Sequence, residues 1–330
     1  MAGSLLIVLV ASACGSSTED PIPKAAAATP STVSQPPSTT LLGDIEFDST
    51  DGDAEPLVPL RTAALITTTG VPVSVLGQSG ERMVVRTPCG GIDFVSGGTQ
   101  LRAVDVVLDP GHGGPIATGA VGPNGLVESV LNLRVAESAL AEMALRGITA
   151  TSTRSGDYAT TLTVRAAFAD NLRARLMVSI HHNAPNGAPS SSPGTEVYVQ
   201  SGSMDSSRLG GLLQSYVSSA LGGLEDIRWS AAGDAGVLRV LNSQGADAYS
   251  MVRRPETTTA LVELGYISNS DEATLFATEE YAVVAGAALA DAVEAFLNSA
   301  EPGSGFVGEP RIFNPRSAPG ADVCVDPDLE

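Results

Sequence analysis

Five residues of this sequence combine the side chains and the spacing that a catalytic metal site needs. The chain has three histidines, His112 in a Gly-His-Gly-Gly loop and the adjacent pair His181 and His182, so any imidazole chemistry must use these positions. Glu128 follows His112 by sixteen residues (128 − 112), and Glu263 lies in an apolar Leu-Val-Glu-Leu-Gly run. Two imidazoles and one carboxylate are the protein ligands of many catalytic zinc sites, which leave the fourth position to water.

The position of Glu128 in a helical pattern favours a metal partner. A step of three residues from Glu128 and further steps of four give Leu131, Val135, Ala139 and Met143, an otherwise apolar stripe. The carboxylate therefore lies at the start of a stripe that faces a core. Burying its charge there costs free energy unless a cation lies next to it. The only lysine of the chain, Lys24, lies in a stretch rich in Pro, Ala, Ser and Thr. A metal ion is then the simplest partner.

The elements that must position these residues alternate between strand and helix over residues 103–298. This alternation predicts an α/β domain with a mainly parallel, twisted sheet and helices on both faces. The predicted strands are 104–109, 148–153, 176–181, 195–200 and 259–265, and the predicted helices are 126–147, 162–175, 204–221 and 279–297. In such sheets the functional crevice lies beyond the carboxyl ends of the strands. Both histidine motifs and Glu263 fall at such ends.

Each motif alone also has an ordinary structural interpretation. The Gly-His-Gly-Gly loop is compatible with a plain turn, and the charge of Glu128 with the positive N-terminal end of a helix. The histidine pair is compatible with hydrogen-bonded residues at a strand end, and a single buried Glu263 with a structural role. A shared edge of one sheet favours a common site for all of them.

The composition excludes several classes of function. Lys and Arg together number 18 against 37 for Asp and Glu, a net charge of −19, which repels nucleic acid. The single lysine lies outside any predicted fold, which excludes a P-loop lysine and a Schiff-base lysine. No Gly-x-Ser-x-Gly elbow of a serine hydrolase occurs.

The chain before the α/β domain divides into three predicted parts. Residues 1–14 form a signal peptide that ends in a lipobox, with Cys14 as the lipidated residue. Residues 15–54 form a disordered linker, 55–100 form a small β-rich module, and 299–330 form a C-terminal tail. We therefore expect an exported protein of the cell envelope that is lipid-anchored to the outer face of the cytoplasmic membrane. Free secretion is the alternative.

Export also bears on the cysteines. With Cys14 lipidated, Cys89 and Cys324 remain as an even number in an oxidising compartment. We expect them to form a disulfide that ties the tail to the front of the fold. Two independent free thiols are the alternative.

Four motifs in order resemble the zinc-dependent N-acetylmuramoyl-L-alanine amidases: VVLDPGHGG, GLVESVLNL, VSIHHNA and LVELGYISN. The resemblance covers residues 105–297. It implies a Zn²⁺ ion held by His112, Glu128 and His181, with Glu263 as the catalytic carboxylate. The implied substrate is peptidoglycan, cleaved by zinc-activated water at the amide between the lactyl group of N-acetylmuramic acid and L-alanine of the stem peptide.

Where the family usually has a small residue after the second histidine ligand, this chain has His182. Alternation along a strand points His181 and His182 to opposite faces, which favours His181 as the ligand. Some family members carry an insertion that blocks the zinc until a partner moves it. The sequence leaves open whether residues 229–256 gate the site in this way and which partner would act. A related zinc peptidase or deacylase acting on another amide, and a non-catalytic wall-binding lipoprotein, remain alternatives.

Overall fold

The computed structural model describes residues 62–184, 188–189, 194–224, 230–231, 236–314 and 323–330. The predicted signal peptide with Cys14, the linker and residues 55–61 of the β-rich module lie outside the described residues. All described residues belong to one compact unit, Asp53–Glu330. Within those ranges, no helix is both long and apolar enough to cross a bilayer.

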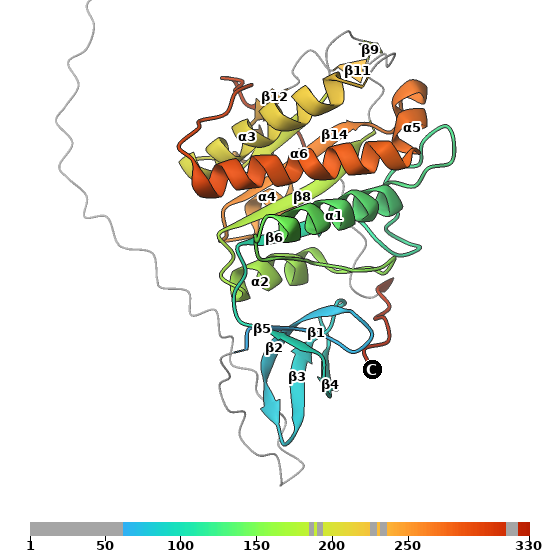
Figure 1. Ribbon diagram of the computed structural model, residues 1–330, viewed down its shortest axis with the longest axis vertical. Coiled ribbons are helices and arrows are strands. Elements are labelled where there is room, and N and C mark those ends of the chain that lie inside the picture. The colour runs from blue at the N-terminus through green and yellow to red at the C-terminus, as the bar shows by residue number, and fades with distance from the viewer. Residues whose placement is uncertain (1–61, 185–187, 190–193, 225–229, 232–235, 315–322) are drawn as a thin grey trace, which may run out of the picture. The chain divides into compact units, whose positions relative to one another are not determined.

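The N-terminal part of this unit is a five-stranded antiparallel sheet with the order β4-β3-β2-β1-β5 (Figure 1). Its strands are β1 (Ala64–Ile66), β2 (Pro72–Ser79), β3 (Arg82–Arg86), β4 (Ile92–Val95) and β5 (Thr99–Leu101). Ala64 belongs to the same hydrophobic core as Val107 and Phe168, which lie in the α/β domain. The small module is therefore packed against the α/β domain rather than joined to it only through the chain.

The α/β domain is built on a six-stranded sheet with the order β12-β10-β14-β8-β6-β7. Its strands are β6 (Val106–Pro110), β7 (Ala150–Ser152), β8 (Leu176–Asn183), β10 (Glu196–Val199), β12 (Gly236–Leu238) and β14 (Thr259–Tyr266). All neighbouring pairs are parallel except β10 and β14, which are antiparallel. The mainly parallel sheet predicted from the alternation of elements is confirmed. Its strands are almost fully buried, as expected for a sheet covered on both faces.

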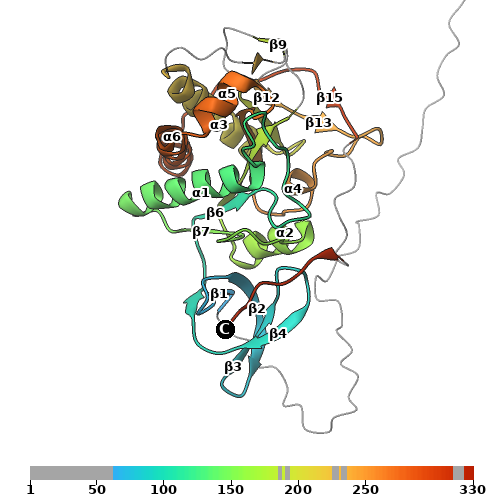
Figure 2. The same cartoon turned by 90° about the vertical axis from the view of Figure 1, so that its right-hand side faces the viewer.

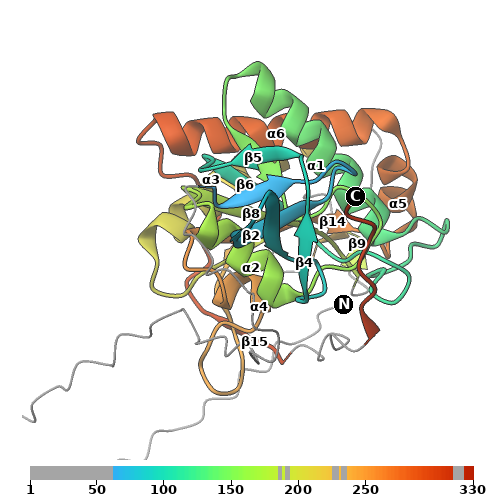
Figure 3. The same ribbon diagram turned by 90° about the horizontal axis from the view of Figure 1, so that it is seen from below.

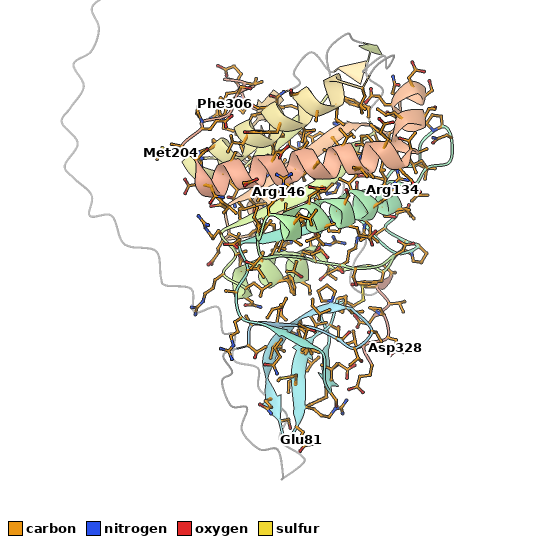
Figure 4. All side chains as sticks on the ribbon, viewed as in Figure 1. Glu81, Arg134, Arg146, Met204, Phe306 and Asp328 are labelled. Carbon is orange, nitrogen blue, oxygen red and sulfur yellow. A yellow bond between two sulfur atoms is a disulfide. The ribbon has the colours of Figure 1, made fainter. Side chains whose placement is uncertain are left out.

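Helices cover both faces of this sheet (Figures 2 and 3). The helices are α1 (Glu128–Leu145), α2 (Leu162–Asn171), α3 (Met204–Gly222), α4 (Ser250–Arg253), α5 (Ser270–Phe276) and α6 (Glu279–Asn298). One core joins α1, α3 and α6 to the sheet. On the opposite face, α2 and α4 pack against β6 and β8. Arg146 near the end of α1 ion-pairs with Asp291 of α6 in the outer layer (Figure 4).

Helix α1 shows how local sequence sets the position of a site residue. The whole predicted stripe is buried, including Glu128 at the first position of the helix. At the other end Gly147 has φ +72°, and the amide of Ile148 donates to the carbonyl of Met143 at 3.0 Å. This is the Schellman arrangement that ends helices at glycine. Because the buried stripe begins at Glu128, the first residue of α1, this side chain lies at the edge of the sheet where β6 and β8 end.

The C-terminal tail packs against the α/β domain and the β-rich module. Strand β15 (Arg311–Ile312) pairs in parallel with β13 (Val240–Leu241). Before it, Phe306 and the α3 residue Met204 line one surface pocket, and Figure 4 shows both labels at the same end of α3. Further on, Cys324 forms a disulfide with Cys89 of the β-rich module.

Candidate active site

Three strands bring their functional side chains into one row. In the parallel pair of β14 and β8, Glu263 lies opposite His181, and in the antiparallel pair of β10 and β14, Glu196 lies opposite Glu263. Side chains directly opposite each other share a face and lie about 5 Å apart at Cβ. Val262 and Leu264 belong to the core under α1, α3 and α6. The row therefore lies on the other face of the sheet.

His112, Glu128 and His181 meet at the end of this row. Glu128 Oε1 lies 3.2 Å from His112 Nε2 and 3.1 Å from His181 Nδ1. One ligand atom from each of the three residues lies within 4.8 Å of the others. Glu128 Oε2 accepts a hydrogen bond from the amide of Ala120 at 2.8 Å, which fixes the carboxylate in this orientation. The structure thus brings the three sequence-predicted ligands together.

The three residues fit a zinc ion by donor type and by spacing. Tetrahedral zinc with bonds of about 2.0–2.1 Å separates its ligand atoms by about 3.3 Å, close to the observed 3.1 and 3.2 Å. Burial, partly offset by Glu128, lowers the pKa of His181, so the imidazole is neutral and able to coordinate. Burial alone would raise the pKa of Glu128, but hydrogen bonds from His112 and His181 hold it well below its ordinary range. The carboxylate is ionised, as a ligand must be.

The loop that carries His112 is strained and tightly packed. His112 has φ +64°, a left-handed conformation that is unusual for a residue with a Cβ and that recurs at functional sites. The preceding Gly111 has no room for a side chain, because a Cβ there would lie 2.1 Å from His181 Cε1. The motif therefore needs glycine at this position to bring the loop against the second histidine.

Two buried arginines hold the carbonyl groups of this loop. Arg154 donates to the carbonyls of Pro110 at 2.8 Å and Gly111 at 3.1 Å. Arg165 donates to the carbonyls of Pro110 at 2.9 Å and His112 at 2.6 Å. Arg165 also forms a buried ion pair with Asp109 Oδ1 at 2.8 Å. These contacts fix the backbone on both sides of His112. No motif or spacing in the sequence indicates this role of the two arginines.

Replacement of Asp109 by asparagine is expected to destabilise the fold by about 3–5 kcal/mol, because Arg165 would remain buried without its counter-charge. Burial opposes ionisation, but Arg165 and hydrogen bonds from Thr153 and Ser179 still lower the pKa of Asp109 below 3.8. A lowered folded-state pKa gives stability that is present above about pH 4 and is lost as the pH falls through the folded value. Urea unfolding from pH 7 down to pH 3 should therefore show a shallower acid loss in Asp109→Asn than in the parent.

Asp291→Ala is the matched control, because its ion pair with Arg146 is on the surface, where Asp291 is 48% exposed. Removing it should cost less than about 1 kcal/mol. Equal losses for the two variants would contradict a special role for the Asp109 pair.

Glu263 has the environment of a proton-transfer group. It is 8% exposed, and its buried Oε2 atom has no hydrogen-bond partner among the residues that the structure covers. Burial, together with the negative charges of Glu128 and Glu196, raises the pKa of Glu263 well above its ordinary value. A carboxylate with a raised pKa next to a metal site is a stronger base than an exposed one, which suits general acid–base work.

His182 lies on the face opposite His181, as strand alternation predicts. Its Nδ1 atom lies 2.7 Å from Asn132 Oδ1, and its Nε2 atom lies 2.7 Å from the hydroxyl of Tyr281. Since an amide oxygen only accepts, Nδ1 donates and Nε2 accepts from the tyrosine. Burial lowers the pKa of His182 to about 3. Both ring nitrogens are used between α1 and α6, so His182 has a structural role.

Sequence reasoning missed Glu196 and Arg311 altogether. Glu196 is fully buried at the start of β10, and Arg311 forms an ion pair with it at 2.8 Å. An acidic residue at the head of a predicted buried strand was the available signal for Glu196. Arg311 carried no signal, because nothing in the tail sequence indicates which residue reaches the sheet.

The fold and the site together define an α/β enzyme with a His-Glu-His cluster and a neighbouring buried carboxylate at the carboxyl ends of its strands. The family model of the N-acetylmuramoyl-L-alanine amidases (Amidase_3) matches residues 106–295. The chain belongs to this family and is an N-acetylmuramoyl-L-alanine amidase by fold and enzyme class, which confirms the resemblance seen in the four motifs.

The chain is also similar to individual relatives and solved structures. The chain is 35% identical over 200 residues to the uncharacterized protein YqiI of Bacillus subtilis, covering 60% of this chain and 87% of that protein. It is 44% identical over 86 residues to the N-acetylmuramoyl-L-alanine amidase AmiA of Escherichia coli, covering 26% and 28%. Among solved structures, Cwp6 from Clostridium difficile matches with a TM-score of 0.50 and 26% identity, over 59% of this chain and 30% of that one.

Proposed function

We propose that this protein is a zinc-dependent hydrolase of peptidoglycan that cleaves the amide between the lactyl group of N-acetylmuramic acid and L-alanine of the stem peptide. His112, Glu128 and His181 would hold the zinc ion, and Glu263 would be the catalytic carboxylate. The observation that supports these roles best is the convergence of the three ligand atoms within 4.8 Å, with Glu263 next to His181 in the strand register.

A zinc ion bound by these residues supplies Lewis-acid activation of water and of the scissile carbonyl. The protein residues then have separate tasks. Glu128, ionised and held by Ala120 and both imidazoles, keeps the cluster in a single arrangement. Glu263 accepts a proton from the attacking water and delivers it to the leaving nitrogen, so that the products are a free lactyl carboxylic acid and the amino group of L-alanine.

Incubation of the purified full chain with peptidoglycan and with a muramyl peptide tests this function, with the products identified by mass spectrometry. We expect stem peptide that begins with L-alanine, together with unmodified glycan. A chelator should abolish cleavage, and added Zn²⁺ should restore it. Cleavage at another amide would instead indicate a related zinc peptidase or deacylase. Zinc-loaded protein that binds the wall without cleaving it would indicate the non-catalytic alternative.

We propose in addition that the protein acts on the outer side of the cytoplasmic membrane, held there by a lipid on Cys14. Peptidoglycan lies outside that membrane, and a disulfide between Cys89 and Cys324 suits an oxidising compartment. The intact mass of the protein from its native membrane, measured without reductant, tests both points. It should include a lipid on Cys14 and lack the two hydrogens of a dithiol. An unlipidated N-terminus or two free thiols would contradict the corresponding part.

A further inference from the structure

Glu196 lies beside Glu263 in the row of side chains that crosses β10, β14 and β8. Glu196 is fully buried, and each of its oxygens is hydrogen-bonded. Tyr198 donates to Oε2 at 2.6 Å, and Asn183 donates to the same atom at 3.2 Å. Tyr266 donates to Oε1 at 3.2 Å. The carboxylate is therefore the hub of a polar network built from three neighbouring strands.

The positive charge in this network comes from the tail. Arg311 donates through Nη1 to Glu196 Oε2 at 3.1 Å and through Nη2 to Oε1 at 2.8 Å. This is the bidentate arrangement that makes arginine–carboxylate pairs strong and fixed in orientation. The guanidinium side chain is 27% exposed, whereas the carboxylate side chain is 0% exposed. Glu196 is thus shielded from water and depends on Arg311 for charge compensation.

Backbone hydrogen bonds and ring stacking between the tail and the α/β domain fix the position of Arg311. Its backbone continues the edge of the sheet, since Val237 donates to Gly305 at 2.7 Å and Val307 donates to Val237 at 3.0 Å. The amides of Arg311 and Phe313 then donate to the carbonyls of Arg239 and Leu241, at 3.0 and 2.8 Å. The Phe313 ring stacks on Tyr249, which stacks on Tyr198 of the Glu196 network. Figure 2 shows β15 beside β13.

The location of this ion pair connects it with catalysis. Glu196 is the direct cross-strand neighbour of Glu263, which lies between Glu196 and His181 in the row. Without Arg311, a buried and uncompensated carboxylate would lie next to the carboxylate that must transfer protons. Like charges at this position would repel each other, and the network that holds Tyr198 and Asn183 would lose its counter-charge.

We propose that Arg311, supplied by the C-terminal tail, is a positioning residue of the amidase site. Its charge neutralises Glu196 and thereby holds the hydrogen-bonded side chains beside Glu263 in their active arrangement. The catalytic unit of this chain then includes the tail contacts as far as Phe313, beyond the family match at 106–295. This inference rests on the proposed function, because it assigns a role in the same reaction.

The test uses the full chain with Arg311→Ala, Arg311→Lys, Glu196→Gln and the double variant Glu196→Gln with Arg311→Ala. Measured quantities are kcat and KM on a soluble muramyl peptide, the zinc content and the thermal midpoint. We expect Arg311→Ala to lower kcat by about 10–100-fold, the usual loss on removing a residue that orients an active group, with zinc retained and KM little changed. In the Glu196→Gln background the same substitution should cause no further loss, because the charge it neutralises is gone.

Ile312→Ala is the matched control, since Ile312 adjoins Arg311 on β15 and is 62% exposed. It should keep the parent kcat. Arg311→Lys, which keeps the charge, should retain more activity than Arg311→Ala. If Glu196→Gln is itself inactive, the comparison of Arg311→Lys with Arg311→Ala decides. Equal losses of kcat in these two variants would overturn the proposal.

Three results would count against the role of Arg311. These are a kcat for Arg311→Ala equal to that of Ile312→Ala, an equal loss in the parent and Glu196→Gln backgrounds, and a rise in KM alone, which would make Arg311 a substrate contact. A parent protein that binds zinc but cleaves no muramyl peptide contradicts the proposed function instead. An active parent with an equally active Arg311→Ala contradicts only this inference.

Discussion

Replacement of Glu263 by alanine or glutamine is expected to remove nearly all amide cleavage while the protein keeps its zinc. Glu263 is not among the three residues whose ligand atoms converge, so the metal site stays intact in both variants. Its raised pKa, caused by burial and by the charges of Glu128 and Glu196, suits a group that accepts a proton and then returns it. General acid–base groups contribute about 10²–10⁴-fold, and kcat should fall by that factor.

The measurement is kcat on a muramyl peptide together with zinc per protein chain. Glu256→Ala provides a matched control, because Glu256 is an exposed glutamate shortly before β14 on the same segment. It should behave like the parent. Activity of Glu263→Gln within tenfold of the parent would remove Glu263 from the mechanism, and loss of zinc in that variant would make it a ligand.

The adjacent histidines should respond to substitution in opposite ways. His181→Ala is expected to weaken zinc binding by more than about 100-fold, since loss of a ligand costs more than loss of an outer partner. His182→Ala should retain zinc, because its ring lies between Asn132 and Tyr281 on the other face. It should instead lower the free energy of unfolding by about 1–3 kcal/mol for each buried partner left unsatisfied.

Zinc titration and urea unfolding of both variants separate these effects. Tyr281→Phe serves as a control for the structural arm, because it removes only the hydroxyl that His182 Nε2 accepts from. It should reproduce part of the stability loss without changing zinc affinity. Zinc retained in His181→Ala but lost in His182→Ala would reverse the ligand assignment.

Much of the α/β fold could be predicted because its signals are local. Alternating apolar runs and helical stripes indicated the parallel sheet, and the stripe that begins at Glu128 is buried throughout its length. Strand alternation alone separated His181 from His182. The antiparallel direction of β10 was not predictable, because a run of buried residues does not encode the direction of its neighbour.

The sequence by itself determined the four motifs and the family, and it predicted the residues that would hold zinc, because catalytic chemistry restricts which side chains can do this work. Only the tertiary structure decided how these residues are supported. Arg165 and Asp109 are 56 residues apart in the chain, and Arg311 and Glu196 are 115 residues apart, yet each pair meets in the fold. Long-range ion pairs of this kind leave no periodic pattern. Their existence depends on where the chain returns to the sheet, which is settled by packing over the whole domain.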